Sequence, residues 1–175
     1  MTVSHNGVSV RYAEVSDAEI LTKWWNDGEV MAHAGFPYGI GTTAEKTAEQ
    51  IKAESDKTRR RFIIEYQKTP IGEMSYRHVD GKTAEIGIKI CVTDYQNKGI
   101  GRIALSLFIN MLFDKGYDEI ILDTNLNNVR AQHVYETLGF EKTGVRYDSW
   151  RDRTGALQSA VDYRLTKKDF KSFIK

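Results

Sequence analysis

The six residues from Gln96 to Gly101 form the segment of this chain best suited to chemistry. They read Gln-Asn-Lys-Gly-Ile-Gly and stand between a strand-like run at 84–92 and a helix-like run at 100–115. A glycine-bearing turn in this place can direct several backbone N–H groups at one anion. The N-terminus of the following helix adds donors and the positive end of a dipole. The segment therefore predicts a site for a phosphate or a pyrophosphate.

Two common phosphate loops fit this segment poorly. A Walker A loop requires Gly-Lys-Ser/Thr, but Arg102 follows the last glycine, so this class is excluded. A Rossmann dinucleotide site fits better, because 99–104 reads Gly-x-Gly-x-x-Ala and Asp123 ends a strand about twenty residues later. However, the preceding strand carries Glu85 and Lys89 on one polar face, and only about fifty residues follow Asp123. The dinucleotide site therefore stays an alternative.

A third class is supported by motifs along nearly the whole chain. The turn at 96–101 resembles the Arg/Gln-x-x-Gly-x-Gly/Ala pyrophosphate loop of the GNAT (Gcn5-related) N-acetyltransferases. The segment 128–140 resembles that family's Asn…Ala…Tyr-x-x-x-Gly-Phe helix. The segments 25–30 and 148–163 are similar to its RimJ/RimL-like branch. Several motifs in the right order carry more weight than one motif alone.

The resemblance implies a fold and a reaction. The fold is the GNAT-like acyl-CoA N-acyltransferase fold, an α/β arrangement of three layers. Its mixed, largely antiparallel twisted sheet has about seven strands and is flanked by about four helices. Residues 1–175 are expected to form one such domain. The implied reaction moves an acetyl group from acetyl-CoA to a primary amine by direct attack in a ternary complex. A non-catalytic acyl-CoA sensor is the alternative.

The resemblance also implies which residues hold coenzyme A. The backbone of 90–92 would pair with the pantetheine amides like an added strand and supply an N–H to the oxyanion. Asn128 would cap its helix and contact the pantetheine arm. The expected coenzyme-binding residues are Ile90, Cys91, Val92, Gln96, Asn97, Lys98, Gly99, Ile100, Gly101, Arg102 and Asn128.

Two residues are expected to move protons. The amine must lose a proton, because an alkylammonium of pKa about 10 has no lone pair. Glu85 is the expected base, since the family often carries a glutamate there; a surface carboxylate is the alternative. Tyr135 is the expected acid, because a phenol can protonate the departing thiolate; plain packing is the alternative. Cys91 lacks a basic partner and is not expected to be a nucleophile.

The acceptor site is expected in the glycine-rich segment 28–41, interpreted as a mobile loop. His33, Phe36 and Tyr38 are its candidate substrate-binding residues. The acceptor would be a protein N-terminus, as in the RimJ/RimL branch, or a small amine, polyamine or aminoglycoside. The four histidines lack metal-ligand spacing, so no metal site is expected.

Composition excludes several other classes. Of 175 residues, 28% are charged and the net charge is +1, so no general attraction to nucleic acid is expected. The single cysteine and the lack of an apolar run of membrane length favour a cytoplasmic protein that neither spans nor binds a membrane. Members of the family often pair, so a monomer and a homodimer both stay open.

Alternating and helical periodicities predict the elements that must position these residues. A capping box is expected at Ser16–Glu19, and hairpin turns at Thr69-Pro70 and Asp80-Gly81. The expected strands are 8–12, 61–66, 71–79, 83–92, 119–123, 140–150 and 158–165. The expected helices start at Ser16, at Thr43, at Ile100 and after the cap Asn127.

Overall fold

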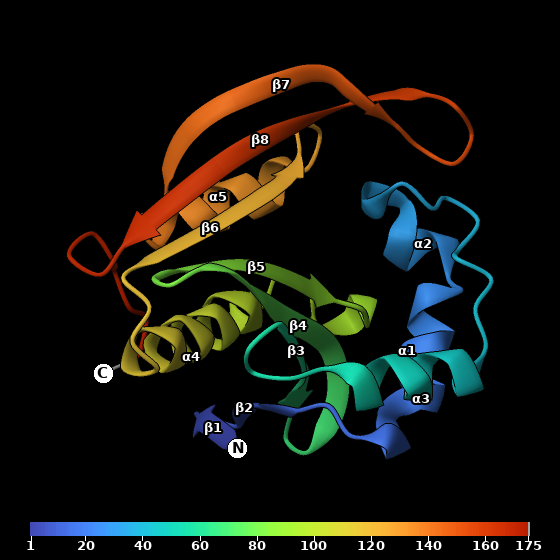
Figure 1. Ribbon diagram of the computed structural model, residues 1–175, viewed down its shortest axis with the longest axis horizontal. Coiled ribbons are helices and arrows are strands. Elements are labelled where there is room, and N and C mark those ends of the chain that lie inside the picture. The colour runs from blue at the N-terminus through green and yellow to red at the C-terminus, as the bar shows by residue number, and fades with distance from the viewer. Residues whose placement is uncertain (175) are drawn as a thin grey trace.

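The computed structural model describes residues 1–174, which form an eight-stranded sheet in the order β1-β2-β3-β4-β5-β6-β8-β7 (Figure 1). The strands are β1 (Thr2–His5), β2 (Val8–Tyr12), β3 (Arg59–Tyr66), β4 (Thr69–Asp80), β5 (Thr83–Ile90), β6 (Glu119–Asn125), β7 (Glu141–Arg151) and β8 (Leu157–Thr166). The α-helices are α1 (Ala18–Trp25), α2 (Gly28–Met31), α3 (Ala44–Ala53), α4 (Ile100–Asp114) and α5 (Val129–Thr137). The predicted fold class is confirmed, with one strand and one helix more than expected.

The sheet is covered on both faces, which makes three layers. Successive side chains of a strand point to opposite faces, and β3 shows this directly. Phe62 and Ile64 belong to the larger apolar cluster, which contains residues of α4 and α5. Ile63 belongs to the smaller cluster, with residues of α1, α2 and α3. The continuous apolar run in β3 thus reflects burial on both sides.

The parallel pair β5–β6 determines where the site lies. All other neighbouring strands are antiparallel. The strands β5 and β6 pair at three positions only, from Thr83↔Glu119 to Glu85↔Ile121. Beyond Glu85 they diverge toward the N-terminal end of α4, and the sheet opens there (Figure 1).

The N-terminal part differs from the expectation in two ways. The strand β1 was not expected, and it pairs with β2 through the turn Asn6-Gly7, where φ is 48° and 79°. This dipeptide is typical of a type I′ hairpin turn. The expected capping box at Ser16–Glu19 is wrong, because Glu14 and Asp17 form the box at a 3-10 turn that precedes α1. The Asp17 carboxylate also pairs with Arg11 at 2.8 Å.

The segment 28–41 is more structured than a mobile loop. It contains α2 and a 3-10 turn at Ala32–Ala34. A Cβ on Gly28 would lie 2.0 Å from the Pro37 carbonyl oxygen, so this glycine serves close packing.

Two further boundaries are also corrected. The turn between β3 and β4 is Gln67-Lys68, with φ of 48° and 67°, and not Thr69-Pro70, which lies in β4. Asn128, and not Asn127, caps α5.

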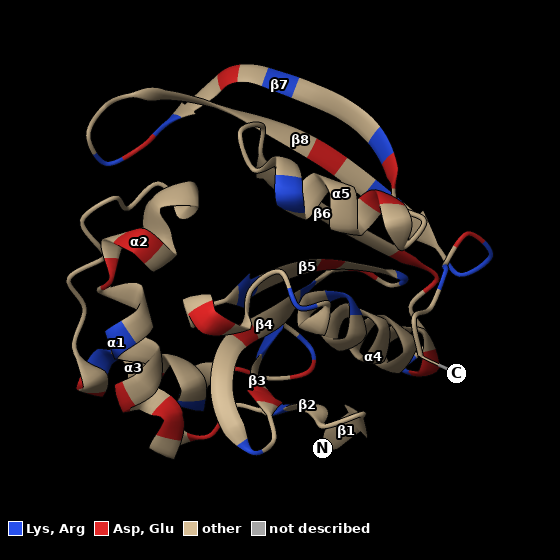
Figure 2. Ribbon diagram, turned by 180° about the vertical axis from the view of Figure 1, so that it is seen from behind, with Lys and Arg blue, Asp and Glu red and all other residues tan. Residues whose placement is uncertain are grey.

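No helix within residues 1–174 is long and apolar enough to cross a membrane. Acidic and basic positions are interspersed along β7, as Figure 2 shows. This mixing agrees with the near-zero net charge of the chain.

Candidate functional site

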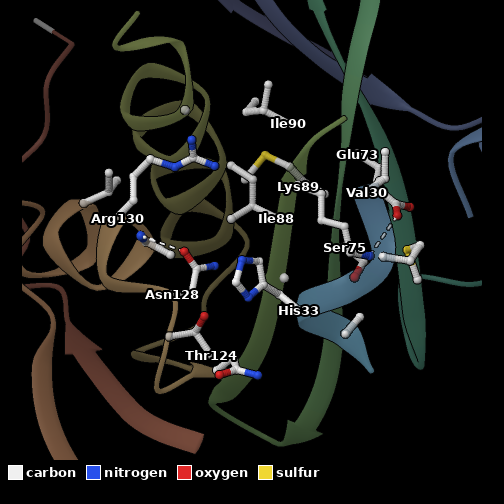
Figure 3. Close-up of a pocket in the computed structure, with 18 of the residues that line it drawn as sticks. Val30, His33, Glu73, Ser75, Ile88, Lys89, Ile90, Thr124, Asn128 and Arg130 are labelled. Carbon is white, nitrogen blue, oxygen red and sulfur yellow. Dashed lines mark hydrogen bonds and ion pairs between the residues drawn. The ribbon is translucent and has the colours of Figure 1, made fainter. Parts of the chain in front are cut away.

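A cavity of about 1550 Å³ lies where β5 and β6 diverge. One part, here called the turn half, is lined by the turn before α4, by the end of β5 and by the first turns of α5. The other part, here called the sheet half, lies over one face of β3, β4 and β5, with α2 and the end of β7 across from it. Figure 3 shows labelled side chains of both halves around one space.

The turn half is built as an anion cradle. Gly99 has a φ of 76° and begins α4 without a side-chain cap, so the first N–H groups of the helix keep their donor capacity. The Gln96 side chain donates to the Ile90 carbonyl oxygen at 3.0 Å and accepts from Arg130 Nη1 at 2.9 Å. These bonds fix the turn against β5 and α5. Lys98 and Arg102 also line it and add positive charge.

The fold has room for a side chain at Gly101, in the anion cradle. A Cβ there would meet only Ile90 Cγ1, at 3.9 Å, which is an ordinary contact. Its backbone is also outside the left-handed region. Because Gly101 lines the cavity, a larger side chain would take room from a bound anion and not from the core.

The end of β5 corrects the expectation for Cys91 and Val92. Both backbone N–H groups donate to the Ile71 carbonyl oxygen, at 2.8 and 3.1 Å, so neither is free for a ligand. Since N–H groups alternate in direction along a strand, those of Ile88 and Ile90 point to the open edge. Both residues line the cavity. Burial raises the pKa of the Cys91 thiol, which makes it a poor nucleophile.

Tyr135, on α5, and Asn128, the N-cap of α5, both line the turn half. Tyr135 is 6% exposed, and its ring packs against those of Phe140 and Tyr163, each 5.8 Å away between centroids. Burial, with a smaller effect of Asp123, raises the pKa of its phenol. Asn128 Oδ1 accepts from the Ala131 N–H at 3.3 Å, so it caps α5 as well as facing the cavity (Figure 3).

Glu85 is not brought to the cavity. It lies on β5 before the divergence, is ion-paired with Arg77 and is absent from the cavity wall. The sequence placed it on the correct polar face but could not show how far along the strand the cavity extends.

The acceptor residues expected from segment 28–41 are placed differently from one another. His33 and Phe36 line the cavity, and the His33 ring points into it (Figure 3). Tyr38 is 85% exposed and does not line it, which corrects the expectation.

The tip of the β7–β8 hairpin is hydrogen-bonded to segment 28–41 through Arg153, and these bonds are here called the strap. The Arg153 N–H donates to the Gly35 carbonyl oxygen at 2.9 Å, and Arg153 Nη1 donates to the Ile40 carbonyl oxygen at 2.8 Å. Trp150, near the tip, lines the cavity. The strap therefore holds the two segments that face the sheet half.

The sheet half contains a buried ionic cluster that sequence reasoning missed. Glu73 accepts from Trp25 Nε1 at 2.8 Å and from Lys89 Nζ at 3.3 Å, and Arg61 Nε lies 3.6 Å from it. Arg61 Nη2 lies 3.5 Å from Glu54. Burial lowers the pKa of Arg61. The available signal was the polar residues that interrupt the apolar runs of β3 and β4.

Replacing Glu73 by leucine is expected to lower the free energy of unfolding by about 3 kcal/mol, because Arg61 would lose a carboxylate in a buried place. Urea denaturation measures this change. Glu85→Leu is the control, since it breaks an exposed pair on the same sheet face and is expected to cost at most about 1 kcal/mol. Equal losses in the two variants would contradict the role given to Glu73.

Residues 1–174 contain no cluster of three or more His, Cys, Asp or Glu side chains able to hold a metal ion. The cavity wall combines backbone donors, cations, a phenol and an imidazole with the carboxylates of Glu29, Glu73 and Asp123.

Comparisons with known proteins agree on one family. The family described as "Acetyltransferase (GNAT) domain" matches residues 8–141. Human N-acetyltransferase 8 is 33% identical over 52 residues, which are 30% of this chain and 23% of that protein. The chain therefore matches less than a quarter of the length of this relative.

Solved structures share the fold over nearly the whole chain. RimL, a ribosomal L7/L12 α-N-protein acetyltransferase in complex with coenzyme A, superposes with a TM-score of 0.83 at 16% identity, over 95% of this chain and 98% of that one. Spermidine N-acetyltransferase from Vibrio cholerae, in complex with CoA and spermine, has a TM-score of 0.83 at 22% identity, over 94% and 98%.

Proposed function

Because the chain belongs to the GNAT acetyltransferase domain family, we propose that it transfers an acetyl group from acetyl-CoA to a primary amine. One observation carries this proposal. The uncapped start of α4 and its fixed turn open into a large cavity at the point where β5 and β6 diverge. That arrangement is suited to a diphosphate at the helix start and to an extended ligand along the edge of β5.

The residues present fit coenzyme A. The N–H groups at the start of α4, together with Lys98 and Arg102, would hold the diphosphate. The edge N–H groups of Ile88 and Ile90 would pair with the pantetheine amides or with the thioester oxygen. Asn128 faces the same channel. Acetyl-CoA, when bound, supplies an acetyl group activated as a thioester.

His33 is the proposed proton acceptor for the amine. Glu85 lies off the cavity, and Glu73 is occupied by Trp25, Arg61 and Lys89. His33 is an exposed residue, and its imidazole points into the cavity (Figure 3). A neutral imidazole nitrogen can accept a proton from a bound amine. The amine nitrogen then forms the new bond to the acetyl carbon, and the carbon–sulfur bond breaks.

Tyr135 is the proposed donor to the departing sulfur. Tyr135→Phe is expected to lower kcat about tenfold while the Kd for CoA stays unchanged, because the ring and its packing are kept. Since burial raises its pKa, the phenol stays protonated up to pH 10, and any alkaline change in rate below that belongs to another group. Steady-state kinetics and calorimetry measure the two quantities.

Tyr163→Phe is the matched control for Tyr135. Its ring packs beside Tyr135, but its hydroxyl donates to Glu136 at 2.8 Å and it does not line the cavity. An unchanged kcat in Tyr135→Phe would refute the donor role.

The acceptor amine, the cellular location and the oligomeric state of the protein are further proposals. The overlap with RimL supports membership of the RimJ/RimL-like branch and a protein N-terminus as acceptor, and the overlap with spermidine N-acetyltransferase supports a small amine. We also propose that residues 1–175 form one domain, that the protein is cytoplasmic and that it pairs into a homodimer.

A free-thiol assay tests the proposed function. Purified protein is mixed with acetyl-CoA and a panel of amines and peptides, and release of CoA is recorded. Tight CoA binding without turnover on any amine would favour the non-catalytic sensor. Protection against thermal unfolding by NADH but not by CoA would favour the dinucleotide alternative.

A further inference from the structure

Nine residues of β3, β4 and β5 form a regular array on one sheet face, and six of them line the sheet half: Arg59, Arg61, Glu73, Ser75, Gly87 and Lys89. The strand register aligns them in three rows: Arg59, Arg77 and Glu85; Arg61, Ser75 and Gly87; and Ile63, Glu73 and Lys89. The middle row has small residues at two of its three positions. A Cβ on Gly87 would meet only Ser75 Oγ, at 3.7 Å. This row therefore forms the low floor of the sheet half, with charged side chains at its border.

One donor at this border has no partner. Arg61 Nη1 is buried and makes no hydrogen bond within residues 1–174. The Arg61 side chain is 8% exposed, and Arg61 lines the cavity. Its Nε and Nη2 atoms lie 3.6 and 3.5 Å from Glu73 and Glu54, beyond good hydrogen-bond length. A buried donor left unpaired is costly, so an acceptor group of a ligand would satisfy it.

The charges on this part of the wall favour an anion. Arg59, Arg61 and Lys89 line it, and Glu73 is the carboxylate among them. Arg59 is exposed, has no ion-pair partner within the described residues, and further lowers the pKa of Arg61. Across the cavity, α2 contributes Glu29. A polyamine would meet more cations than carboxylates on this face, which disfavours it.

We propose that the acceptor amine also carries a carboxylate, which binds over Ser75 and Gly87 against Arg61 and Arg59. This inference rests on the proposed acetyl transfer and names its substrate class. The Arg61 guanidinium presents planar donors suited to a carboxylate, and Lys89 borders the same floor. Glu29, across the cavity, is the counterpart for the amino group.

Matched amines test the substrate class. The free-thiol assay compares L-leucine, L-leucinamide and isopentylamine, the corresponding three compounds from L-phenylalanine, and aminohexanoate with hexylamine; spermidine is the polycation. The expected result is a kcat/KM at least tenfold higher for the carboxylate in one or more sets. Equal or reversed values in every set, or a preference for spermidine, would overturn the substrate class and leave acetyl transfer standing. If no amine releases thiol, the proposed function itself fails, and the inference with it.

Variants then locate the carboxylate. Arg61→Lys is expected to raise the KM of the carboxylate-bearing amine about tenfold and to leave the KM of its carboxylate-free partner unchanged. Arg59→Gln, at an exposed position that is safe for folding, is expected to raise the same KM about threefold. Arg60→Gln is the control, because Arg60 lies on the other sheet face and pairs with Asp56 at 2.9 Å. If Arg59→Gln and a folded Arg61→Lys leave both KM values unchanged, the assignment is wrong.

Discussion

An aspartate in place of Gly101 is expected to weaken CoA binding more than 100-fold and, with it, to abolish acetyl transfer. The new carboxylate would stand at the start of α4, where the N–H groups and the dipole favour an anion. It would occupy these donors itself and repel the diphosphate. Calorimetry with CoA measures the loss directly.

This variant is informative because the fold should tolerate it. A Cβ at residue 101 meets only Ile90 Cγ1 at 3.9 Å, so the unfolding temperature without ligand is expected to stay near that of the natural protein. Gly144→Asp is the control for added charge, since a Cβ there meets nothing within 4 Å and residue 144 is outside the cavity wall. If Gly101→Asp binds CoA as the natural protein does, the diphosphate site is elsewhere.

Replacing His33 by alanine is expected to lower kcat/KM for the amine about 100-fold at pH 7, because a positioned general base contributes roughly this factor. The Kd for CoA should not change, since His33 reaches the cavity from the 3-10 turn at Ala32–Ala34 and is not part of the turn at 96–101 or of α4. Added imidazole should restore part of the rate. Steady-state kinetics over a pH series, with and without imidazole, measure both effects.

His5→Gln is the control for His33. His5 lies on the edge strand β1 and not on the cavity wall, so its replacement is expected to leave the rate unchanged. A His33→Ala protein with kcat/KM within threefold of the natural one, and no response to imidazole, would remove His33 from the reaction.

The sequence was most informative where the structure depends on residues that are close together in the chain. The turn at 96–101 and the helix behind it depend on a glycine in the left-handed region, a helix start and nearby side chains, all within one short segment. The strand and helix periodicities gave the elements and the fold class for the same reason. The fold class is confirmed. Of the turn, the structure places Gln96, Asn97, Lys98, Gly99 and Gly101 on the cavity wall, whereas Ile100, also expected to bind the coenzyme, packs in the apolar core.

The sheet half was not predictable because it depends on register. Arg61, Ser75 and Gly87 become neighbours only when β3, β4 and β5 pair in one particular alignment. Glu85 was expected at the site because the resembling family often carries a glutamate there. It shares the polar face of β5 with Lys89, but the two lie about 13 Å apart along the strand. The divergence of β5 from β6 decides which of them meets the cavity, and nothing in the local sequence marks where it begins.

The strap between Arg153 and segment 28–41 has a consequence for how such a protein can change its substrate. Its bonds end on the main-chain oxygens of Gly35 and Ile40, which every amino acid possesses. Side chains at positions of that segment other than its closely packed glycines Gly28, Gly35 and Gly39 can therefore be exchanged while these bonds to the hairpin are kept. Mutations in this wall, away from His33, would then change the preference for the part of the amine that faces it, while the proposed diphosphate and carboxylate sites stay intact.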